Sequence, residues 1–330
     1  MQLTEPEKQV LIGLKVISRR DKPTREMLDK SRKLIFDDEL LEWGRTLDEL
    51  IERGIINETD GVLSLSDGIR VIADRLQRRW SSRGFSEWLI KSEKSQTYSE
   101  FCRRLYGLDL CQCSMTDKRQ LDFLLKTLKL NKDNRVLDVG CGIGVITEFI
   151  SDATGAHVTG VDFAAGAIDR ARRRTVRKKD RLRYKTKDME ALRFEPGSFD
   201  TVIAIDSLYF TEDLDRLVKR LVELVEPGGQ MGIFYSPIIP PEQSKFLLQP
   251  GKTKFAAALK KADKDFRYWD FSRDEADIWK NSKAIAEDLK EAFTQEGYAD
   301  LYESRIKESE RQIKVVAEGR TRRYLYHVTL

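Results

Sequence analysis

The chain has 330 residues, with 59 Lys and Arg against 55 Asp and Glu, a net charge of +4, and 40% hydrophobic residues. This length favours two domains, and the apolar fraction excludes a chain that is disordered throughout. No apolar run approaches the ~18–20 residues of a membrane span, the charged N-terminus does not resemble a secretory signal, and four cysteines make no disulfide framework. We therefore expect a cytoplasmic protein without a membrane partner.

The first 90 residues are expected to be helical and to form an accessory domain. Apolar residues at helical spacing predict helices that begin at Pro6 and at Pro23, and a third helix over 38–53. An Asp-Gly turn at 60–61 then joins two short strands into a hairpin. Three helices followed by a hairpin resemble a winged helix-turn-helix module.

The charge of this domain argues against DNA binding. Residues 1–90 contain 16 basic and 17 acidic residues, a net charge of −1. The helix that would enter a DNA groove, 37–53, has two arginines against seven acids. The acids are Asp37, Asp38, Glu39, Glu42, Asp48, Glu49 and Glu52. Because phosphates would repel this helix, we expect the domain to support a homodimer or to close the substrate pocket.

Residues 91–130 are expected to connect the domains and to form a lid. The segment is polar but carries aromatic residues, and Tyr98, Tyr106 and Met115 are the lid residues expected to contact substrate. Cys111 and Cys113 have no second pair at zinc spacing and no histidine nearby. No metal site is therefore expected.

An α/β domain is predicted over 131–330, where short apolar runs alternate with helical stretches. The predicted strands are 135–139, 157–161, 182–186, 200–205 and 230–235. This alternation indicates right-handed crossovers and a mainly parallel sheet. Proline and aromatic residues interrupt it at about 236–282, which we expect to be a cap over the substrate. A helix at about 282–296 and a last strand at 324–330 follow.

The most informative motif is Asp138-Val139-Gly140-Cys141-Gly142-Ile143-Gly144. An apolar strand leads into three glycines at alternate positions, and a helix begins at Val145. Glycines let the backbone pass close to a nucleotide-like ligand. The N–H groups at the start of the helix also suit an anionic group. On its own, the loop is equally consistent with a tight turn that binds nothing.

Acidic residues after the following strands favour a ligand. Asp162 ends the second strand, 18 residues after Gly144, where a carboxylate would accept both hydroxyls of a ribose. Asp188 and Met189 follow the third strand and suit the amine and the face of adenine. Asp206 ends the fourth strand at the carboxyl edge, where open sheets bind ligands.

Together with the turn at 226–229, these motifs resemble class I S-adenosylmethionine-dependent methyltransferases over about residues 115–235. The resemblance implies a Rossmann-like seven-stranded sheet in the order 3-2-1-4-5-7-6, with 324–330 as the antiparallel last strand, and S-adenosylmethionine as the cofactor. The cofactor-binding residues would be Asp138, Gly140, Cys141, Gly142, Gly144, Asp162, Phe163, Asp188, Met189 and Asp206.

Two related ligands fit the loop less well. An NAD-dependent dehydrogenase needs Gly-x-Gly-x-x-Gly, whereas the third glycine here comes one position early. Asp138 would also repel the pyrophosphate of NAD, but it can meet the α-ammonium group of a methionine moiety. Polyamine synthases share the fold and usually have a loop richer in Gly and Asp.

Methyl transfer requires alignment of the nucleophile and exclusion of water, and a base only where the nucleophile is protonated. His157 and His327 are expected to be structural, and the histidine that plant-type O-methyltransferases use is absent. Asp206 and Tyr209 are therefore the catalytic candidates; alternatively, Asp206 caps the next helix. The other substrate candidates, besides the three lid residues, are Tyr209, Tyr235 and Trp269.

Eleven basic residues concentrate within 170–187, where only Asp180 opposes them. They could contact an anionic partner such as RNA, or they could form a solvated helix face, which we favour. We predict an enzyme that methylates a small molecule at oxygen or nitrogen. An RNA methyltransferase and a cofactor-sensing, DNA-binding regulator are the alternatives.

Overall fold

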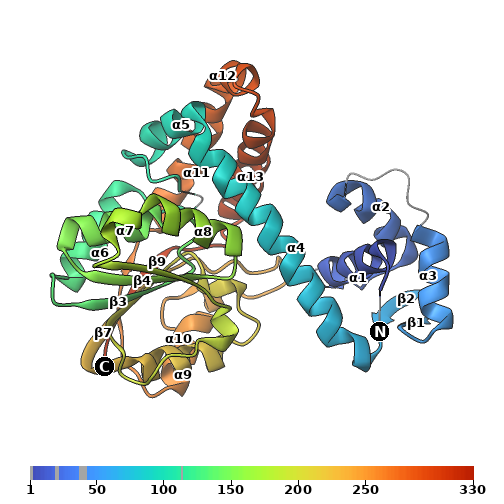
Figure 1. Cartoon of the computed structure of the whole chain (residues 1–330), viewed down its shortest axis with the longest axis horizontal. Coiled ribbons are helices and arrows are strands. Elements are labelled where there is room, and N and C mark those ends of the chain that lie inside the picture. Colours follow the sequence, from blue (N-terminus) through green and yellow to red (C-terminus); the bar gives the residue numbers. More distant parts are fainter. Residues whose placement is uncertain (1–2, 19–21, 37–42, 113) are drawn as a thin grey trace. The chain divides into compact units, whose positions relative to one another are not determined.

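The computed structural model describes residues 3–18, 22–36, 43–112 and 114–330, and it divides into two compact units, Met1–Gly84 and Phe85–Leu330 (Figure 1). The boundary falls inside helix α4 (Asp67–Lys94), a few residues before the predicted end of the accessory domain. No helix in the described part of the chain combines the length and apolar character that crossing a membrane requires.

The first unit has the predicted order of elements. Its helices and strands are α1 (Glu5–Ser18), α2 (Arg25–Phe36), α3 (Trp43–Glu52), β1 (Ile56–Thr59), β2 (Val62–Leu65) and the start of α4. Asp60 and Gly61 both have positive φ, which suits the tight turn of the β1–β2 hairpin. The predicted acids of the groove helix at 37–42 lie outside the described residues. Assignment of this unit to the winged-helix class stays a prediction.

The second unit contains a seven-stranded sheet in the order β5-β4-β3-β6-β7-β9-β8. The strands are β3 (Arg135–Val139), β4 (His157–Asp162), β5 (Leu182–Thr186), β6 (Phe199–Ile205), β7 (Val225–Tyr235), β8 (Arg267–Asp270) and β9 (Tyr324–Thr329). The pairings from β5 to β7 are parallel, and β9 is antiparallel to both neighbours. This confirms the predicted order 3-2-1-4-5-7-6 and the antiparallel last strand.

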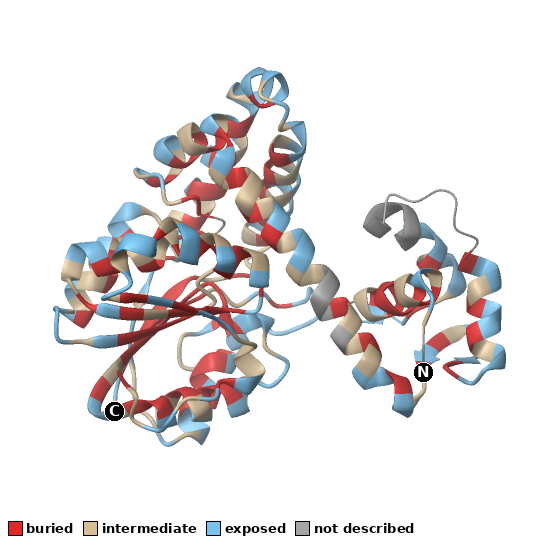
Figure 2. Ribbon diagram, in the orientation of Figure 1, coloured by how far each residue is buried: buried red, intermediate tan, exposed pale blue. Residues whose placement is uncertain are grey.

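Helices cover both faces of the sheet, whose strands are largely buried (Figure 2). One face packs against α6 (Lys118–Leu128), α7 (Val145–Thr154) and α8 (Ala165–Arg174). The other packs against α9 (Leu214–Leu224) and α10 (Lys254–Lys261). The parallel strands all end at one edge, so the loops that follow β3, β4, β5 and β6 lie next to one another.

Four further helices form a cap on this unit. They are α5 (Gln96–Tyr106), α11 (Ser272–Asp288), α12 (Lys290–Gln295) and α13 (Ala299–Ala317). Figure 1 shows them grouped together on the opposite side of the sheet from α9 and α10. The inserted helices therefore lie at 272–317, further along the chain than the expected cap at 236–282. That earlier stretch instead supplies α10 and the edge strand β8.

Helix α13 was not predicted because its inward face is partly polar. Arg305, Ser309 and Gln312 follow one another at helical spacing and are all buried. The Ser309 hydroxyl lies 2.8 Å from that of Ser282 on α11. Because these polar residues interrupt its apolar ones, the helix gives a weak periodic signal in the sequence.

Part of the basic run at 170–187 is engaged in ion pairs. Five of its cations contact acidic side chains of α4, α7 and α8. The pairs are Arg170–Glu93, Arg172–Asp169, Arg174–Glu93, Arg174–Glu148, Lys178–Glu148, Lys178–Asp152 and Arg181–Asp152. Lys185 and Lys187 lie over the ring of Phe194. This distribution favours a structural role for the run over an RNA-binding one.

Candidate cofactor site

The glycine loop after β3 requires its glycines. Gly140, Gly142 and Gly144 have φ of 83°, 55° and 70°, in the left-handed region that other residues rarely adopt. Space is also short, because a Cβ on Gly140 would lie 2.3 Å from the Cβ of Ser207. A Cβ on Gly144 would lie 2.3 Å from the ring of Tyr184. The loop backbone is thus held from both sides.

Asp138, in β3 just before the loop, is buried and accepts a hydrogen bond from the Thr147 hydroxyl at 2.5 Å. Burial raises the pKa of Asp138 to about 6, and the nearby charge of Asp162 adds to this effect. Such a carboxylate favours a cationic ligand group, which would offset its lost hydration.

Asp162 lies at the end of β4 and faces the loop. Its two oxygens accept hydrogen bonds from the backbone N–H groups of Gly142 and Ala164, both at 2.9 Å. A carboxylate has about four lone-pair sites, so acceptor capacity is left for two hydroxyls. Burial raises the pKa of Asp162, although these N–H groups oppose the shift. Phe163 follows it, partly exposed and stacked on Phe85.

The structure places Cys141 differently from the other loop residues. A Cβ on Gly160 of β4 would lie 2.8 Å from the Cys141 sulfur, so this side chain packs against the strand below. Burial raises the pKa of the Cys141 thiol well above its ordinary range. The backbone of Cys141 is engaged as well, because its N–H donates to the carbonyl of Val161 at 3.1 Å and its carbonyl accepts the N–H of Gly144 at 2.8 Å.

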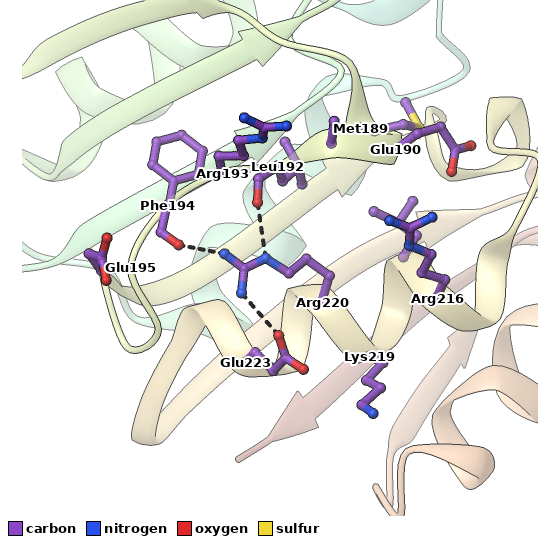
Figure 3. Close-up of a pocket in the computed structure, with 12 residues that line it drawn as sticks. Met189, Glu190, Leu192, Arg193, Phe194, Glu195, Arg216, Lys219, Arg220 and Glu223 are labelled. Carbon is purple, nitrogen blue, oxygen red and sulfur yellow. Dashed lines mark hydrogen bonds and ion pairs between the residues drawn. The ribbon is translucent and has the colours of Figure 1, made fainter. Parts of the chain in front are cut away.

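Asp188 and Met189 lie at the end of β5, as predicted. Asp188 accepts a hydrogen bond from the N–H of Glu190 and so starts a short 3₁₀ turn. Met189 stands at one end of a groove between the segment 189–195 and α9 (Figure 3). In this groove Arg220 donates hydrogen bonds to the carbonyls of Leu192 and Phe194. The segment that carries Met189 is thereby braced against α9.

Asp206 has a different environment from the one expected of a catalytic base. Its carboxylate is buried and forms a bidentate ion pair with Arg323, with Oδ1–Nη1 at 2.6 Å and Oδ2–Nη2 at 2.9 Å. The same carboxylate accepts the N–H of Met115 at 3.1 Å. Because both of its oxygens are engaged, this arrangement favours a structural role for Asp206, and its role in orienting or deprotonating the acceptor stays a prediction.

The structure brings Tyr209 and Tyr235 together. Tyr209 lies in the turn after β6 and is 42% exposed, and its ring is 6.2 Å from that of Tyr235 at the end of β7. Burial raises the pKa of Tyr235 to about 12, so its hydroxyl stays protonated and can act as a donor. These two tyrosines border the carboxyl edge beside the loop and remain candidates for contact with the acceptor.

Three other substrate candidates are packing residues. Tyr98 and Tyr106 lie in the core of the cap, and the Tyr98 hydroxyl donates to the carbonyl of Gln112 at 2.8 Å. Trp269 of β8 packs edge-on against Phe123 of α6. These contacts favour packing roles, and the assignment of the three residues to substrate stays a prediction, because a buried aromatic side chain cannot be told from a lid residue by sequence alone. Cys113, of the expected non-metal pair, lies outside the described residues.

Met115, a further lid candidate, lies in the second unit next to the glycine loop. It is buried in the cap core together with Ile143 of the glycine loop. Its side chain is therefore a packing group, but its segment covers the loop as a lid would. His327 contacts Gln230 at 2.8 Å within the sheet, in the structural environment expected of it.

Sequence reasoning missed Glu275 in the first turns of α11. It is only 3% exposed, and burial raises its pKa to about 7. The negative charge of Asp206 adds to this rise, whereas Arg323 and Arg322 oppose it. The backbone N–H of Arg323 donates to Ser272 at the start of α11, which places this helix beside the ion pair. No motif marks Glu275 among the many charged residues of its segment.

Comparison with known proteins agrees with this geometry. Residues 136–229 match the family described as methyltransferase domain. The chain carries a class I S-adenosylmethionine-dependent methyltransferase domain. Sterol 24-C-methyltransferase erg-4 of Neurospora crassa is 32% identical over 136 residues, 41% of this chain and 35% of that protein. Ubiquinone biosynthesis O-methyltransferase of Coxiella burnetii is 35% identical over 107 residues, 32% of this chain and 44% of that protein.

A solved structure is similar in fold to the methyltransferase domain of this chain. Phosphoethanolamine N-methyltransferase 2 of Haemonchus contortus, in complex with phosphomonomethylethanolamine and S-adenosylhomocysteine, has a TM-score of 0.60 at 21% identity. The alignment covers 74% of this chain and 60% of that one. The chain thus matches less than half the length of the two sequence relatives named above, which methylate different atoms.

The glycine loop offers a direct test of its geometry. Gly140→Ala is expected to weaken binding of S-adenosylhomocysteine at least ~10-fold, because the new Cβ must displace Ser207 or the loop itself. Gly228→Ala is the matched control, since Gly228 has φ of 84° but open space around its Cα. Calorimetric titration measures both affinities. Equal losses in the two variants would show that backbone strain alone, and not the close approach, matters.

Glu275 should make the stability of the protein depend on pH. Because its pKa is raised from 4.5 to about 7 on folding, the folded state holds the proton to higher pH. Its stability therefore falls as pH rises from about 4.5 to about 7. The variant Glu275→Gln lacks this loss. We expect its free energy of unfolding, relative to that of the parent, to rise over this pH interval by on the order of 2–3 kcal/mol.

Chemical denaturation at several pH values measures the effect. Glu291→Gln, a change of an exposed glutamate on α12, serves as the control. A difference between Glu275→Gln and the parent that is constant with pH would contradict the assignment.

Proposed function

We propose that this protein transfers the methyl group of S-adenosylmethionine to a small-molecule acceptor at oxygen or nitrogen. The observation that carries the proposal is the glycine loop of β3, with two buried carboxylates beside it and a helical cap packed on it. The relatives support the chemistry, although they differ in the atom they methylate.

The residues at the carboxyl edge fit the cofactor group by group. Asp138 would meet the α-ammonium group, and the glycine backbone would pass under the methionine moiety. Asp162 has the free lone pairs that two ribose hydroxyls require, and Asp188 with Met189 would hold adenine. When bound, the cofactor supplies an electrophilic methyl group, so the protein needs only to align the acceptor and exclude water.

The cap, together with the end of α4 and the segment before α6, would provide that exclusion. Leu89 and Met115 pack with Ile143 of the glycine loop in one apolar cluster. On the acceptor side, Tyr209 and Tyr235 would orient the nucleophile through their hydroxyls.

A small-molecule acceptor is favoured over RNA. RNA binding needs cations that are free to neutralise phosphates, whereas four of the eleven basic residues in the run are held in ion pairs with Glu93, Glu148 and Asp152. Incubation with labelled cofactor, once with total RNA and once with a metabolite extract, separates the two functions. Label that enters RNA and no metabolite would overturn the choice.

Cofactor binding should raise the melting temperature of the protein. We expect millimolar S-adenosylmethionine or S-adenosylhomocysteine to give a shift of several degrees, and Asp162→Ala to abolish it because the ribose loses its acceptor. Asp152→Ala, on the outer face of α7, serves as the control that removes a carboxylate away from the site. No shift with either ligand would refute the proposed function.

Affinity for S-adenosylhomocysteine should fall in acid. Asp138 has a pKa of about 6, and its carboxylate form is the one that attracts an ammonium group. Lowering the pH from 7 to 5 should therefore weaken binding roughly tenfold. Asp138→Asn should bind more weakly at pH 7 and show a flatter profile. If this variant keeps the parent's pH slope, another group controls binding.

A further inference from the structure

Arg323 is the largest of the fully buried side chains in the described chain, and it lies far from the cofactor motifs in sequence. Besides Asp206, its guanidinium donates to Gln120 at 2.8 Å, Ser236 at 2.8 Å and Thr116 at 2.7 Å. Arg323 thus connects the segment 116–120 to the ends of β6 and β7 and to the start of β9. Neither the cofactor motif nor the acceptor chemistry described above accounts for it.

The partner of Arg323 has an unusual backbone. Asp206 has φ of 54°, a left-handed conformation that is uncommon outside glycine. Its N–H still donates to the carbonyl of Phe234 at 3.2 Å, so the chain turns away from the sheet only after this residue. A strained conformation of this kind persists where the surroundings fix it, and the bidentate pair with Arg323 does so.

The consequence of that turn lies at the next residue. Ser207 is buried, and its hydroxyl donates to the carbonyl of Val139, the last residue of β3, at 2.5 Å. Its Cβ occupies the space that a side chain on Gly140 would need. The backbone conformation of Asp206 therefore decides where Ser207 stands, and Ser207 supports the first turn of the glycine loop.

We propose that Arg323 is a positioning residue for the cofactor loop: its ion pair holds Asp206 in the left-handed conformation that seats Ser207 against Gly140. This inference rests on the proposed function only in taking the glycine loop as the cofactor site. It assigns Asp206 a conformational role, distinct from the catalytic role expected from sequence.

The first experiment removes and then restores the arrangement. Arg323→Met keeps much of the side-chain volume but leaves the Asp206 charge buried without its partner, and we expect S-adenosylhomocysteine to bind at least ~10-fold more weakly. In the double variant Arg323→Met/Asp206→Asn both charges are gone. Asparagine adopts the left-handed region readily and can still accept the Met115 N–H. Affinity should return to within about threefold of the parent.

A matched pair tests the backbone step without any change to Arg323. Asp206→Gly and Asp206→Ala remove the same carboxylate, but only glycine enters the left-handed region freely. The glycine variant should therefore bind S-adenosylhomocysteine several-fold more tightly than the alanine variant. This pair also decides the matter if Arg323→Met does not fold.

Arg135→Met is the control for loss of an arginine bridge. Arg135 links Asp200 of β6 and Glu226 of β7 at the start of β3, the opposite edge of the same sheet. Its loss should lower the melting temperature without changing the affinity of the folded protein. Calorimetric titration well below each melting temperature separates affinity from stability.

The outcomes distinguish this inference from the proposed function. If the parent protein binds no S-adenosylhomocysteine, the proposed function fails. If the parent binds and Arg323→Met binds equally well, only the positioning role is overturned. Failure of the double variant to regain affinity, together with equal affinities of Asp206→Gly and Asp206→Ala, would likewise overturn it.

Discussion

The buried ion pair between Arg323 and Asp206 is the constraint on which the site depends. Two charges withdrawn from water are stable only when they are paired closely and their remaining donors are satisfied. Here the guanidinium finds Gln120, Thr116 and Ser236 in addition to the carboxylate. Removal of one partner from such a pair typically costs about 3–5 kcal/mol. The segments that meet at this pair are therefore held in one arrangement.

The glycine loop shows how that arrangement reaches the cofactor site. Ser207 approaches Gly140 from β6, and the ring of Tyr184 approaches Gly144 from β5. Tyr184 also donates its hydroxyl to the carbonyl of Gly144 at 3.0 Å. The loop is thus set by contacts from β6 and from β5, and the N–H groups of Gly140, Cys141, Gly142 and Gly144 are themselves bonded within the protein. Preorganisation of this kind lowers the entropic cost of binding.

The fold and the position of the glycine loop could be predicted because their signals are local. A strand that runs into three glycines, and acids at the ends of the next strands, are readable within a few residues. Arg323 could not be found in this way, since 117 residues separate it from Asp206 and no motif surrounds it. The same limit explains Tyr98: its spacing fits both a lid and a core, and only the tertiary packing of α11 and α13 places it in the core.

The order of segments along the chain links closure of the cap to completion of the sheet. Helix α13 ends at Ala317, and the chain reaches Arg323 immediately before β9, the strand inserted between β7 and β8. The backbone of Arg323 is bonded to Phe271 and Ser272 at the start of α11, while its side chain holds Asp206 and Thr116. When β9 pairs with β7 and β8, both ends of the helical segment 272–317 are brought to the carboxyl edge of the sheet. Arg323, immediately before β9, therefore also holds the segment that covers the cofactor loop. A substitution at this position can change the affinity for the cofactor without any contact between the residue and the ligand.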